Sequence, residues 1–309
     1  MDSIKIFSVI DEKYVSYMGV LISNIKSLSS KEKLYEYIVV HKNMPDKEIN
    51  TIEKMSSKNF RVRTLNISKY LENIKLPLDK KGEGIFYRIF APSIFSQYDK
   101  ILYLDIDLVV LEDIANLYEK NIDKYELAAV NDIFIINKNT NTFHKDKYCK
   151  HIEYYNEELS MFNLDKYFNS GIMLMNLKLM RQNHTEENII SMFDKYSNLL
   201  YHDQDFLNKY YYDKRDRVLF LDCSYNFLNE FIPYQNELSQ ELYEQYIQAK
   251  QHIKIRHYVS PKKPWNNWNC PNGIYWWKYG IRQPHLLLNL FKSSILRKIK
   301  LTWLMLICR

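Results

Sequence analysis

Two carboxylates spaced two residues apart are the side chains in this sequence whose arrangement most directly suggests chemistry. Asp105 and Asp107 follow the apolar run 101–104. In an extended backbone, side chains at positions i and i+2 point to the same face, so the two negative charges would repel each other. A divalent cation would remove this repulsion, and carboxylate oxygens suit Mg²⁺ or Mn²⁺ that bridges to a diphosphate. Two acids that face water at an ordinary strand end are the alternative interpretation.

A histidine and a lysine near the other end of the chain could complete such a site. His257 lies in the predicted strand 253–258, and Lys263 follows between Pro261 and Pro264. An imidazole nitrogen can bind a metal ion, and a lysine on a turn stiffened by proline can reach a phosphate as a point charge. Alone, His257 would be interpreted as an ordinary surface or core histidine. Together with the two acids, it indicates a site for a metal ion and a phosphate.

The elements that would position these residues are predicted from hydrophobic periodicity. Residues 4–10, 35–41 and 60–67 have the composition of short strands, and helical periodicity covers 14–28 and 46–55. This β-α-β-α-β opening predicts an α/β fold whose parallel sheet is covered on both faces. Further strands are predicted at 100–105, 127–130, 172–177, 218–222 and 253–258, and helices at 86–95, 187–196, 203–212 and 239–249.

The predicted site residues lie where such folds bind ligands, because ligands of open α/β sheets gather at the carboxyl ends of the strands. Residues 134–167 combine polar and aromatic side chains with weak periodicity. We expect this stretch to form a long excursion that could cover the site.

Five groups of residues, in order along the chain, resemble glycosyltransferase family 8, the retaining group that includes bacterial lipooligosaccharide galactosyltransferases and glycogenin. The resemblance runs from about residue 4 to residue 265. It rests on Tyr87-Arg88, Tyr103-Leu104-Asp105-Ile106-Asp107, Phe168-Asn169-Ser170-Gly171-Ile172-Met173, Asp203-Gln204-Asp205, and His257 with Lys263-Pro264-Trp265. It implies a GT-A fold, in which a Rossmann-like nucleotide-binding half merges with an acceptor-binding half, and a Mn²⁺-bound UDP-sugar as donor.

The resemblance also implies roles for the charged residues. Asp105, Asp107 and His257 match the metal ligands, through which the cation would hold both phosphates and neutralise charge on the departing UDP. Lys263 would support the same diphosphate. Arg88 matches the arginine that contacts the nucleotide sugar, although a helix-surface arginine is the alternative.

Two residues after the first predicted strand resemble the uridine pocket of the family. Asp11 is placed for a hydrogen bond to uracil, and Tyr14 for stacking on it. This match is looser than the others, because the family often has small residues where Val9 and Ile10 stand.

Four polar residues match family positions that surround the transferred sugar: Asp132, Asn169, Asp203 and Gln204. Short polar side chains suit such positions, because sugar hydroxyls are recognised by paired donors and acceptors in an enclosed site. The alternatives are turn residues for Asp132 and Asn169 and a helix N-cap for Asp203. Ser170-Gly171 indicates a tight backbone passage beside the ligand or a simple bulge.

The family position nearest the anomeric carbon matches Gln204, and an amide is a poor nucleophile. Retention by double displacement would require a carboxylate close to that carbon. The resemblance therefore favours front-face attack, in which a UDP phosphate oxygen takes the acceptor's proton. Asp203 is the candidate nucleophile if a covalent intermediate forms.

The composition fits one large domain with an appendage. The chain has 309 residues, of which 46% are apolar, so its core requires no disulfide or metal. Its four cysteines show no C-x-x-C spacing, which favours a reduced, cytoplasmic setting. We expect neither a signal peptide nor a membrane span, because no apolar run approaches the required length.

The charge divides the chain into residues 1–265 and residues 266–309. The second part holds seven Lys or Arg residues and no acid, whereas the chain as a whole carries a net charge of +6. The expected organisation is a GT-A domain over 1–265 followed by a basic, aromatic segment. That segment would attach the protein to the inner face of an anionic cytoplasmic membrane, next to a lipid-linked glycan acceptor. Packing on the body or on a partner is the alternative, and nucleic acid is not expected.

Other functions remain open on the same sheet. A sugar-nucleotide hydrolase would use the same metal without a glycan acceptor, and a non-catalytic glycan- or metal-binding protein could keep the fold. A nucleotidyltransferase is disfavoured, because no glycine-rich loop lies between Ile10 and Gly19. The donor hexose is either galactose or glucose, which differ at one hydroxyl.

Overall fold

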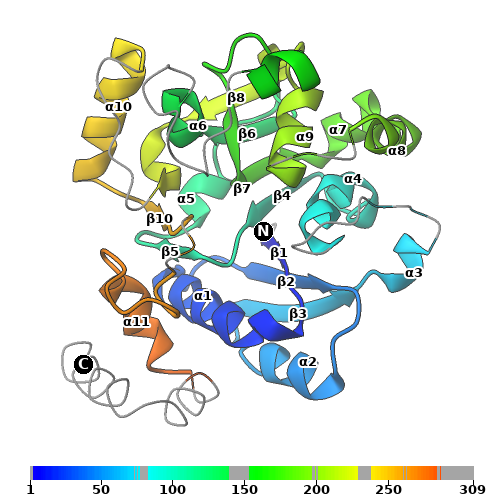
Figure 1. Cartoon of the computed structure of the whole chain (residues 1–309). Coiled ribbons are helices and arrows are strands. Elements are labelled where there is room, and N and C mark those ends of the chain that lie inside the picture. The colour runs from blue at the N-terminus through cyan, green and yellow to red at the C-terminus, as the bar shows by residue number, and fades with distance from the viewer. Residues whose placement is uncertain are drawn as a thin grey trace.

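The structure is a computed structural model of the chain (Figure 1). It describes residues 3–72, 74, 76, 83–138, 153–196, 199, 201–228, 238–259, 261, 263–283 and 286. Much of the predicted excursion and nearly all of the basic tail after residue 283 lie outside the described residues.

A seven-stranded sheet forms the centre of the protein, in the order β3-β2-β1-β4-β7-β6-β8. The strands are β1 (Ile4–Val9), β2 (Tyr35–His41), β3 (Phe60–Asn66), β4 (Lys100–Leu104), β6 (Leu127–Asn131), β7 (Phe168–Asn176) and β8 (Val218–Leu221). All neighbours are parallel except around β7, which is antiparallel to β4 and β6. The predicted α/β fold is confirmed, and the three opening strands pair in parallel as expected; the antiparallel β7 was not predicted.

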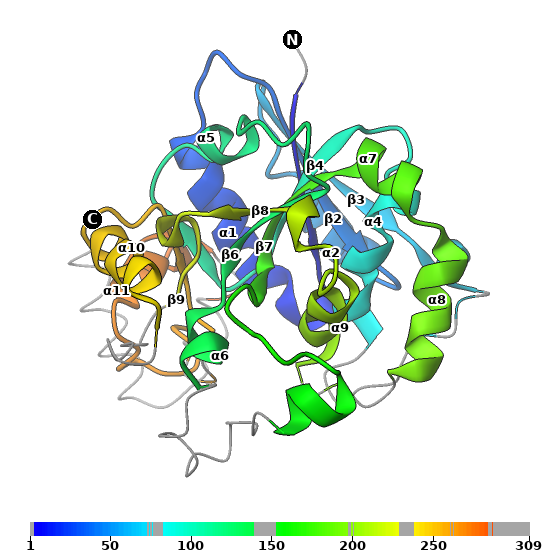
Figure 2. The same ribbon diagram turned by 90° about the horizontal axis from the view of Figure 1, so that it is seen from above.

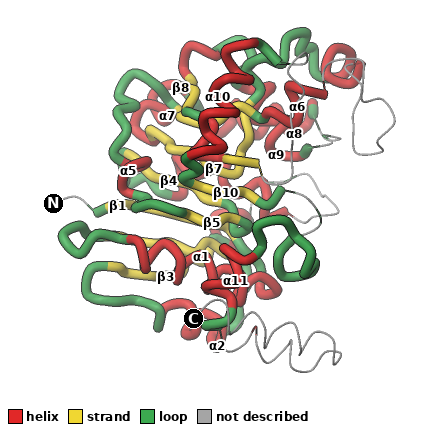
Figure 3. The backbone as a smooth tube through the Cα atoms, turned by 90° about the vertical axis from the view of Figure 1, so that its left-hand side faces the viewer, coloured by secondary structure: helices red, strands yellow, loops and turns green. Residues whose placement is uncertain are grey.

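A smaller sheet of three strands lies beside the first, in the order β5-β10-β9. Its strands are β5 (Leu108–Val110), β9 (Phe227–Leu228) and β10 (Ile255–His257). Figure 3 shows β5 and β10 side by side. The sequence did not predict β5 and β9, because strands of two or three residues are too short to show a periodicity.

Two hydrophobic cores cover the two faces of the large sheet, because alternate residues of each strand point to opposite sides. In β4, Leu102 and Leu104 pack with residues of α1 (Val15–Leu28), whereas Ile101 and Tyr103 face the other core. Figure 2 shows α1 on one side of the sheet and α4 and α8 on the other.

Among the remaining helices, the sequence predicted those near 46–55, 187–196, 203–212 and 239–249 and did not predict five others. The remaining helices are α2 (Asp46–Glu53), α3 (Ser68–Leu71), α4 (Ala91–Ile94), α5 (Ala115–Tyr118), α6 (Ile133–Lys138), α7 (Leu177–Asn183), α8 (Glu186–Lys195), α9 (His202–Tyr210), α10 (Gln240–Gln251) and α11 (Ile274–Gly280). The helix expected at 86–95 is instead a 3-10 helix, Glu83–Phe90, followed by the short α4. Among the described residues, no helix has both the length and the apolar character needed to cross a membrane.

The start of the C-terminal segment is part of the folded body. Helix α11 packs beside α1 (Figure 1), and its residues Trp276, Trp277 and Tyr279 are buried. The rings of Trp265 and Tyr17 stack with centroids 4.5 Å apart across the boundary expected at residue 265. The expectation that the aromatic residues of this segment face a membrane is therefore wrong for Trp276, Trp277 and Tyr279, which are core residues.

Candidate active site

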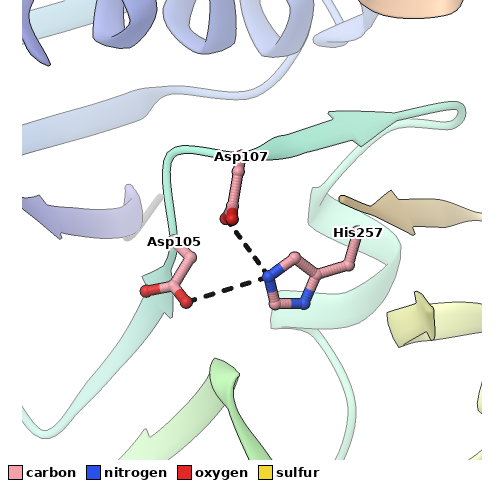
Figure 4. A group of neighbouring side chains, drawn as sticks. All are labelled: Asp105, Asp107 and His257. Atoms are coloured by element: carbon pink, nitrogen blue, oxygen red, sulfur yellow. Dashed lines mark hydrogen bonds and ion pairs between the residues drawn. The ribbon is translucent and has the colours of Figure 1, made fainter. Parts of the chain in front are cut away.

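The two carboxylates lie where the chain passes from one sheet to the other. Asp105 directly follows β4, and Asp107 directly precedes β5, with a bend at Ile106 between them. Figure 4 shows both side chains reaching into the same space from this connection. The carboxylates converge because of the bend, so the expected extended backbone at i and i+2 is not the cause.

Strand β10 brings the histidine to the same place. It pairs antiparallel with β5, and His257 stands opposite Leu108, the residue after Asp107. The Nε2 atom of His257 lies 3.1 Å from Oδ1 of Asp107 and 3.8 Å from Oδ2 of Asp105. Lys263 contacts the other oxygen of Asp107 through its ammonium group. The residues predicted to bind a metal ion and the lysine predicted to bind a phosphate thus form one cluster.

The donor set of this cluster fits a divalent cation. One ligand atom from each of Asp105, Asp107 and His257 lies within 4.8 Å of the other two. Two carboxylate oxygens and an imidazole nitrogen are suitable ligands for Mn²⁺, and the carboxylates suit Mg²⁺. Burial would raise the pKa of Asp107, but the neighbouring ammonium of Lys263 is the strongest of the influences that hold that pKa well below its usual range. Asp107 is therefore a carboxylate, as metal binding requires.

Arg88 lies behind the cluster and connects it to α9. Its guanidinium donates to Oδ1 of Asp105 at 2.9 Å and pairs with Asp203 at 2.8 Å through Nε. It also lies 4.4 Å from the ring centroid of Tyr103, whose hydroxyl donates to Asp105. Burial would lower the pKa of Arg88, but the two carboxylates raise it above its ordinary value. Arg88 is a buried cation that fixes two acids, and a helix-surface role is excluded.

The antiparallel register of β7 brings a second set of polar residues to the site. Because β7 starts beside the end of β4, the N–H of Asp105 donates to Gly171 O at 2.8 Å. Asn169, near the start of β7, stands opposite Val130, near the end of β6. The side chain of Asn169 donates to Asp132 at 2.9 Å, just beyond β6.

Gln204, in the first turn of α9, joins this set through both ends of its amide. Its oxygen accepts from the N–H of Ser170 at 3.1 Å, and its nitrogen donates to Asp132 at 3.0 Å. Burial raises the pKa of Asp132, against the opposing effect of these hydrogen bonds. Asp203 does not cap α9, which begins at His202 and has Tyr201 at its N-cap. Asp132 also accepts from the N–H of Ile135, so its turn role and its place in the site coincide.

Asp11 and Tyr14 lie at the carboxyl end of β1, on the same edge of the sheet. The Asp11 carboxylate accepts from the N–H of Lys13 at 2.9 Å and caps the 3-10 turn Glu12–Tyr14. Tyr14 is 40% exposed, and its ring is tilted 6.0 Å from that of Tyr17. The described contacts of both residues are local, so their roles toward a uridine remain predictions.

Gly171 is required by the close packing of the cluster. A Cβ atom added there would lie 2.8 Å from Oδ2 of Asp105 and 3.0 Å from Oδ1 of Asn169, and would overlap His257. The glycine therefore serves a close approach of backbone to side chains, as one of the two sequence interpretations supposed.

Asn226 is a site residue that the sequence did not reveal. It lies at the end of the 3-10 helix Cys223–Asn226, just before β9, and hydrogen-bonds His257 and Asn169. A single asparagine between apolar residues has no distinguishing spacing. Only the parallel pairing of β9 with β10 brings it to His257.

Known proteins are similar to this chain over most of its length. General stress protein A of Bacillus subtilis (strain 168) is 24% identical over 270 residues, which are 85% of this chain and 87% of that protein. Glycosyltransferase GlyA of Streptococcus pneumoniae is 26% identical over 90% of this chain, which spans 36% of GlyA. The lipopolysaccharide 1,2-glucosyltransferase of Escherichia coli K12 is 24% identical over 88% of this chain and 75% of that protein.

Solved structures share the fold. The apo structure of the WbbM bifunctional glycosyltransferase superposes with a TM-score of 0.77 at 23% identity, covering 92% of this chain and 50% of that chain. The galactosyltransferase LgtC, in complex with donor and acceptor sugar analogues, gives a TM-score of 0.70 at 20% identity over 91% and 96% of the two chains. The expected GT-A fold is confirmed by these structures. The sequence model described as Glycosyl transferase family 8 matches residues 5–269, so the chain belongs to glycosyltransferase family 8.

Proposed function

We propose that this chain is a retaining, metal-dependent hexosyltransferase that moves galactose or glucose from a UDP-sugar to a glycan acceptor. The observation that carries the proposal is the convergence of Asp105, Asp107 and His257, with ligand atoms within 4.8 Å, beside Lys263. Three carboxylates of the site (Asp105, Asp107 and Asp203) lie beside two cations (Arg88 and Lys263). This excess of negative charge favours binding of a divalent cation before a diphosphate can approach.

The metal site would be filled by Mn²⁺ or Mg²⁺, held by the two aspartates and Nε2 of His257. When bound, such a cation supplies Lewis-acid stabilisation of negative charge on a diphosphate. Lys263 is 20% exposed at its side chain and pairs with Asp107, and its flexible side chain could move from there to a phosphate oxygen. Arg88 is held in place by Asp105 and Asp203, so it organises the site without rearrangement.

The sugar would lie against the polar set at the end of β6. Asp132 and Asn169 offer a carboxylate and an amide that are already fixed by mutual hydrogen bonds. Fixed polar groups of this kind recognise hydroxyls at little cost in conformational entropy.

Front-face attack is the mechanism that these contacts favour. The amide of Gln204 is engaged by Ser170 and Asp132, and a carboxamide is a poor nucleophile. The carboxylate of Asp203 is ion-paired with Arg88 and accepts from the hydroxyl of Ser170 at 3.4 Å. Neither side chain is arranged as an unpaired nucleophile, which supports a role in positioning for both.

The proposed acceptor is a cell-surface glycan. A lipid-linked lipooligosaccharide is the first acceptor to test. Support comes from the name of the Escherichia coli relative, a lipopolysaccharide glucosyltransferase. The basic residues after position 283 would hold the protein at the inner face of an anionic membrane. Co-sedimentation with vesicles containing phosphatidylglycerol should be lost when residues 285–309 are removed, and equal pelleting of both forms would contradict membrane attachment.

Release of UDP tests the activity itself. The native chain is assayed with UDP-galactose and UDP-glucose, in Mn²⁺ and in EDTA, beside the double variant Asp105→Ala/Asp107→Ala and the exposed control Asp216→Ala. We expect metal-dependent release from one donor, reduced by more than about 100-fold in the double variant and unchanged in the control. Acceleration by an added glycan identifies a transferase, whereas release that no glycan accelerates identifies a sugar-nucleotide hydrolase.

A further inference from the structure

We propose that Asn226 is a positioning residue that fixes the tautomer of His257, so that the lone pair of Nε2 is available to the cation. The inference rests on the proposed metal site. It assigns a function to a buried asparagine outside the metal-binding, phosphate-binding and sugar-binding residues discussed above.

A relay of hydrogen bonds runs from the backbone N–H of Gly171 through Asn169 and Asn226 to His257. The contacts of Asn169 determine its direction. The backbone N–H of Gly171 can only donate, and it donates to one atom of the Asn169 amide at 2.9 Å. That atom must be the oxygen, so the amide nitrogen of Asn169 points to the carboxylate of Asp132, which accepts it at 2.9 Å.

The same oxygen of Asn169 also receives a hydrogen bond from the side chain of Asn226 at 2.9 Å. The atom of Asn226 that donates must be its nitrogen, and its oxygen is thereby turned to Nδ1 of His257, at 2.8 Å. Because a carbonyl oxygen only accepts, Nδ1 of His257 must carry the proton. A backbone N–H therefore sets the tautomer through two asparagines.

With Nδ1 protonated, the neutral ring carries its lone pair on Nε2. That atom faces Oδ1 of Asp107 at 3.1 Å and Oδ2 of Asp105 at 3.8 Å. A lone pair that faces two carboxylates is unfavourable unless a positive charge lies among them, either a proton on Nε2 or a metal ion that replaces it. Histidine ligands of metals characteristically donate their other ring nitrogen to a carbonyl or carboxylate, which orients the ring and raises its basicity.

The side chains of the relay are buried, so water cannot easily replace the hydrogen bonds between them. Asn226 is 2% exposed, Asn169 is 6% exposed and His257 is 3% exposed. Asn226 is held by the backbone on both sides. Its 3-10 helix is capped by Asp222, and β9 pairs directly with the strand that carries His257. The relay ends at Asp132 and Gln204, so it also joins the proposed sugar-binding residues to the metal ligand.

The test uses the full chain, three variants for metal binding and a fourth, His257→Gln, for spectral assignment. Asn226→Ala removes the acceptor, and Asn226→Asp keeps an acceptor for Nδ1. Asn176→Ala is the control, because Asn176 caps α7 at the far end of β7. Mn²⁺ affinity is measured by electron paramagnetic resonance at saturating UDP, and the tautomer of His257 is read from ¹⁵N chemical shifts of the metal-free protein, assigned with His257→Gln.

We expect wild type to show the Nδ1–H tautomer. Mn²⁺ affinity should fall by about 10- to 100-fold in Asn226→Ala, recover to within about fivefold in Asn226→Asp, and stay unchanged in Asn176→Ala. A purely structural role for Asn226 predicts equal losses in both Asn226 variants, and that result would overturn the inference. So would an unprotonated Nδ1 in wild type, that is, a neutral Nε2–H tautomer; this measurement needs no Asn226 variant. Mn²⁺ binding by wild type with unchanged affinity in Asn226→Ala overturns the inference alone, whereas no binding by wild type overturns the metal site and the inference together.

Discussion

The two ends of β6 each carry a buried carboxylate and a nearby histidine, yet the hydrogen-bond partners of these groups are arranged differently at the two ends. Glu126 precedes the strand and is fully buried. One of its oxygens accepts from Asn183 at 2.7 Å and Arg217 at 2.9 Å, and the other contacts His184 and accepts from Tyr211 at 3.2 Å. Every lone-pair direction is used, and the arginine balances the charge.

The carboxyl end of β6 leads into the opposite arrangement. There Nδ1 of His257 hydrogen-bonds to Asn226, which donates in turn to Asn169, and Nε2 is left facing Asp105 and Asp107. Arg88 and Lys263 leave an excess of negative charge. The difference shows that a buried acid and a histidine do not define a site. An incomplete set of partners does, because a bound cation can then supply what the protein omits.

The largest effect is expected from Gly171→Ala, which would place a methyl group among the side chains at the carboxyl end of β6. The added Cβ would lie 2.8 Å from Asp105 and would overlap His257, so the ligands must separate. UDP release should fall by about 100-fold or more, because displacements near 1 Å have such effects. Gly84→Ala is the matched control, since its Cβ would meet only Val9, at 3.7 Å. Equal activity of the two variants would contradict the close packing of the site.

At the other end of β6, Glu126→Gln should lower the stability of the protein and leave its UDP-release activity intact. The substitution leaves Arg217 without its partner carboxylate and forces an amide nitrogen toward donors, at a cost of about 2–3 kcal/mol in the free energy of unfolding. Urea denaturation measures the loss, beside the exposed control Glu119→Gln. UDP release well below the denaturation midpoint should stay within about twofold of wild type. A large loss of turnover in the stable fraction would mean that the two ends of β6 are coupled.

The same residue predicts a pH dependence of stability. Burial would raise the pKa of Glu126, but His184, Asn183 and Arg217 outweigh burial and lower it. A carboxyl whose pKa is lowered in the folded state stabilises the protein above the unfolded pKa, about 4.3, and this stability is lost as pH falls toward the folded pKa. Denaturation midpoints between pH 7 and pH 3 should therefore fall more steeply in wild type than in Glu126→Gln. Parallel curves would exclude Glu126 as a source of acid sensitivity.

The smallest effect is expected from Arg217→Gln. The side chain of Arg217 is 38% exposed, and three other groups still contact Glu126. Solvent screens the lost ion pair, so the free energy of unfolding should fall by only about 1 kcal/mol. Thermal denaturation beside the exposed control Arg61→Gln measures it. A loss as large as that of Glu126→Gln would show that the arginine, rather than the full set of donors, holds the carboxylate.

The sequence predicted most of the strands and singled out the proposed ligands, whose role stays a prediction, but it did not predict the connections that bring them together. Asp105 and His257 were identified from residue type and order. The antiparallel β7 and the two-residue β9 were not, since neither direction nor pairing is visible in a local pattern. Asn226 and Glu126 escaped for the same reason, because their partners are 31 to 91 residues away in the chain. The aromatic residues of α11 were assigned to a membrane because burial against α1 depends on tertiary packing.

Calorimetric titration of Mn²⁺ into the native chain with saturating UDP tests the central claim most directly. The comparison is Asp107→Asn, which keeps the shape of a ligand but removes its charge. One cation should bind each native chain, with an affinity at least about 100-fold weaker in the variant, because a charged ligand is lost from the site. Equal binding by both proteins, or no binding by the native chain, would contradict the assignment of Asp105, Asp107 and His257 as a metal site.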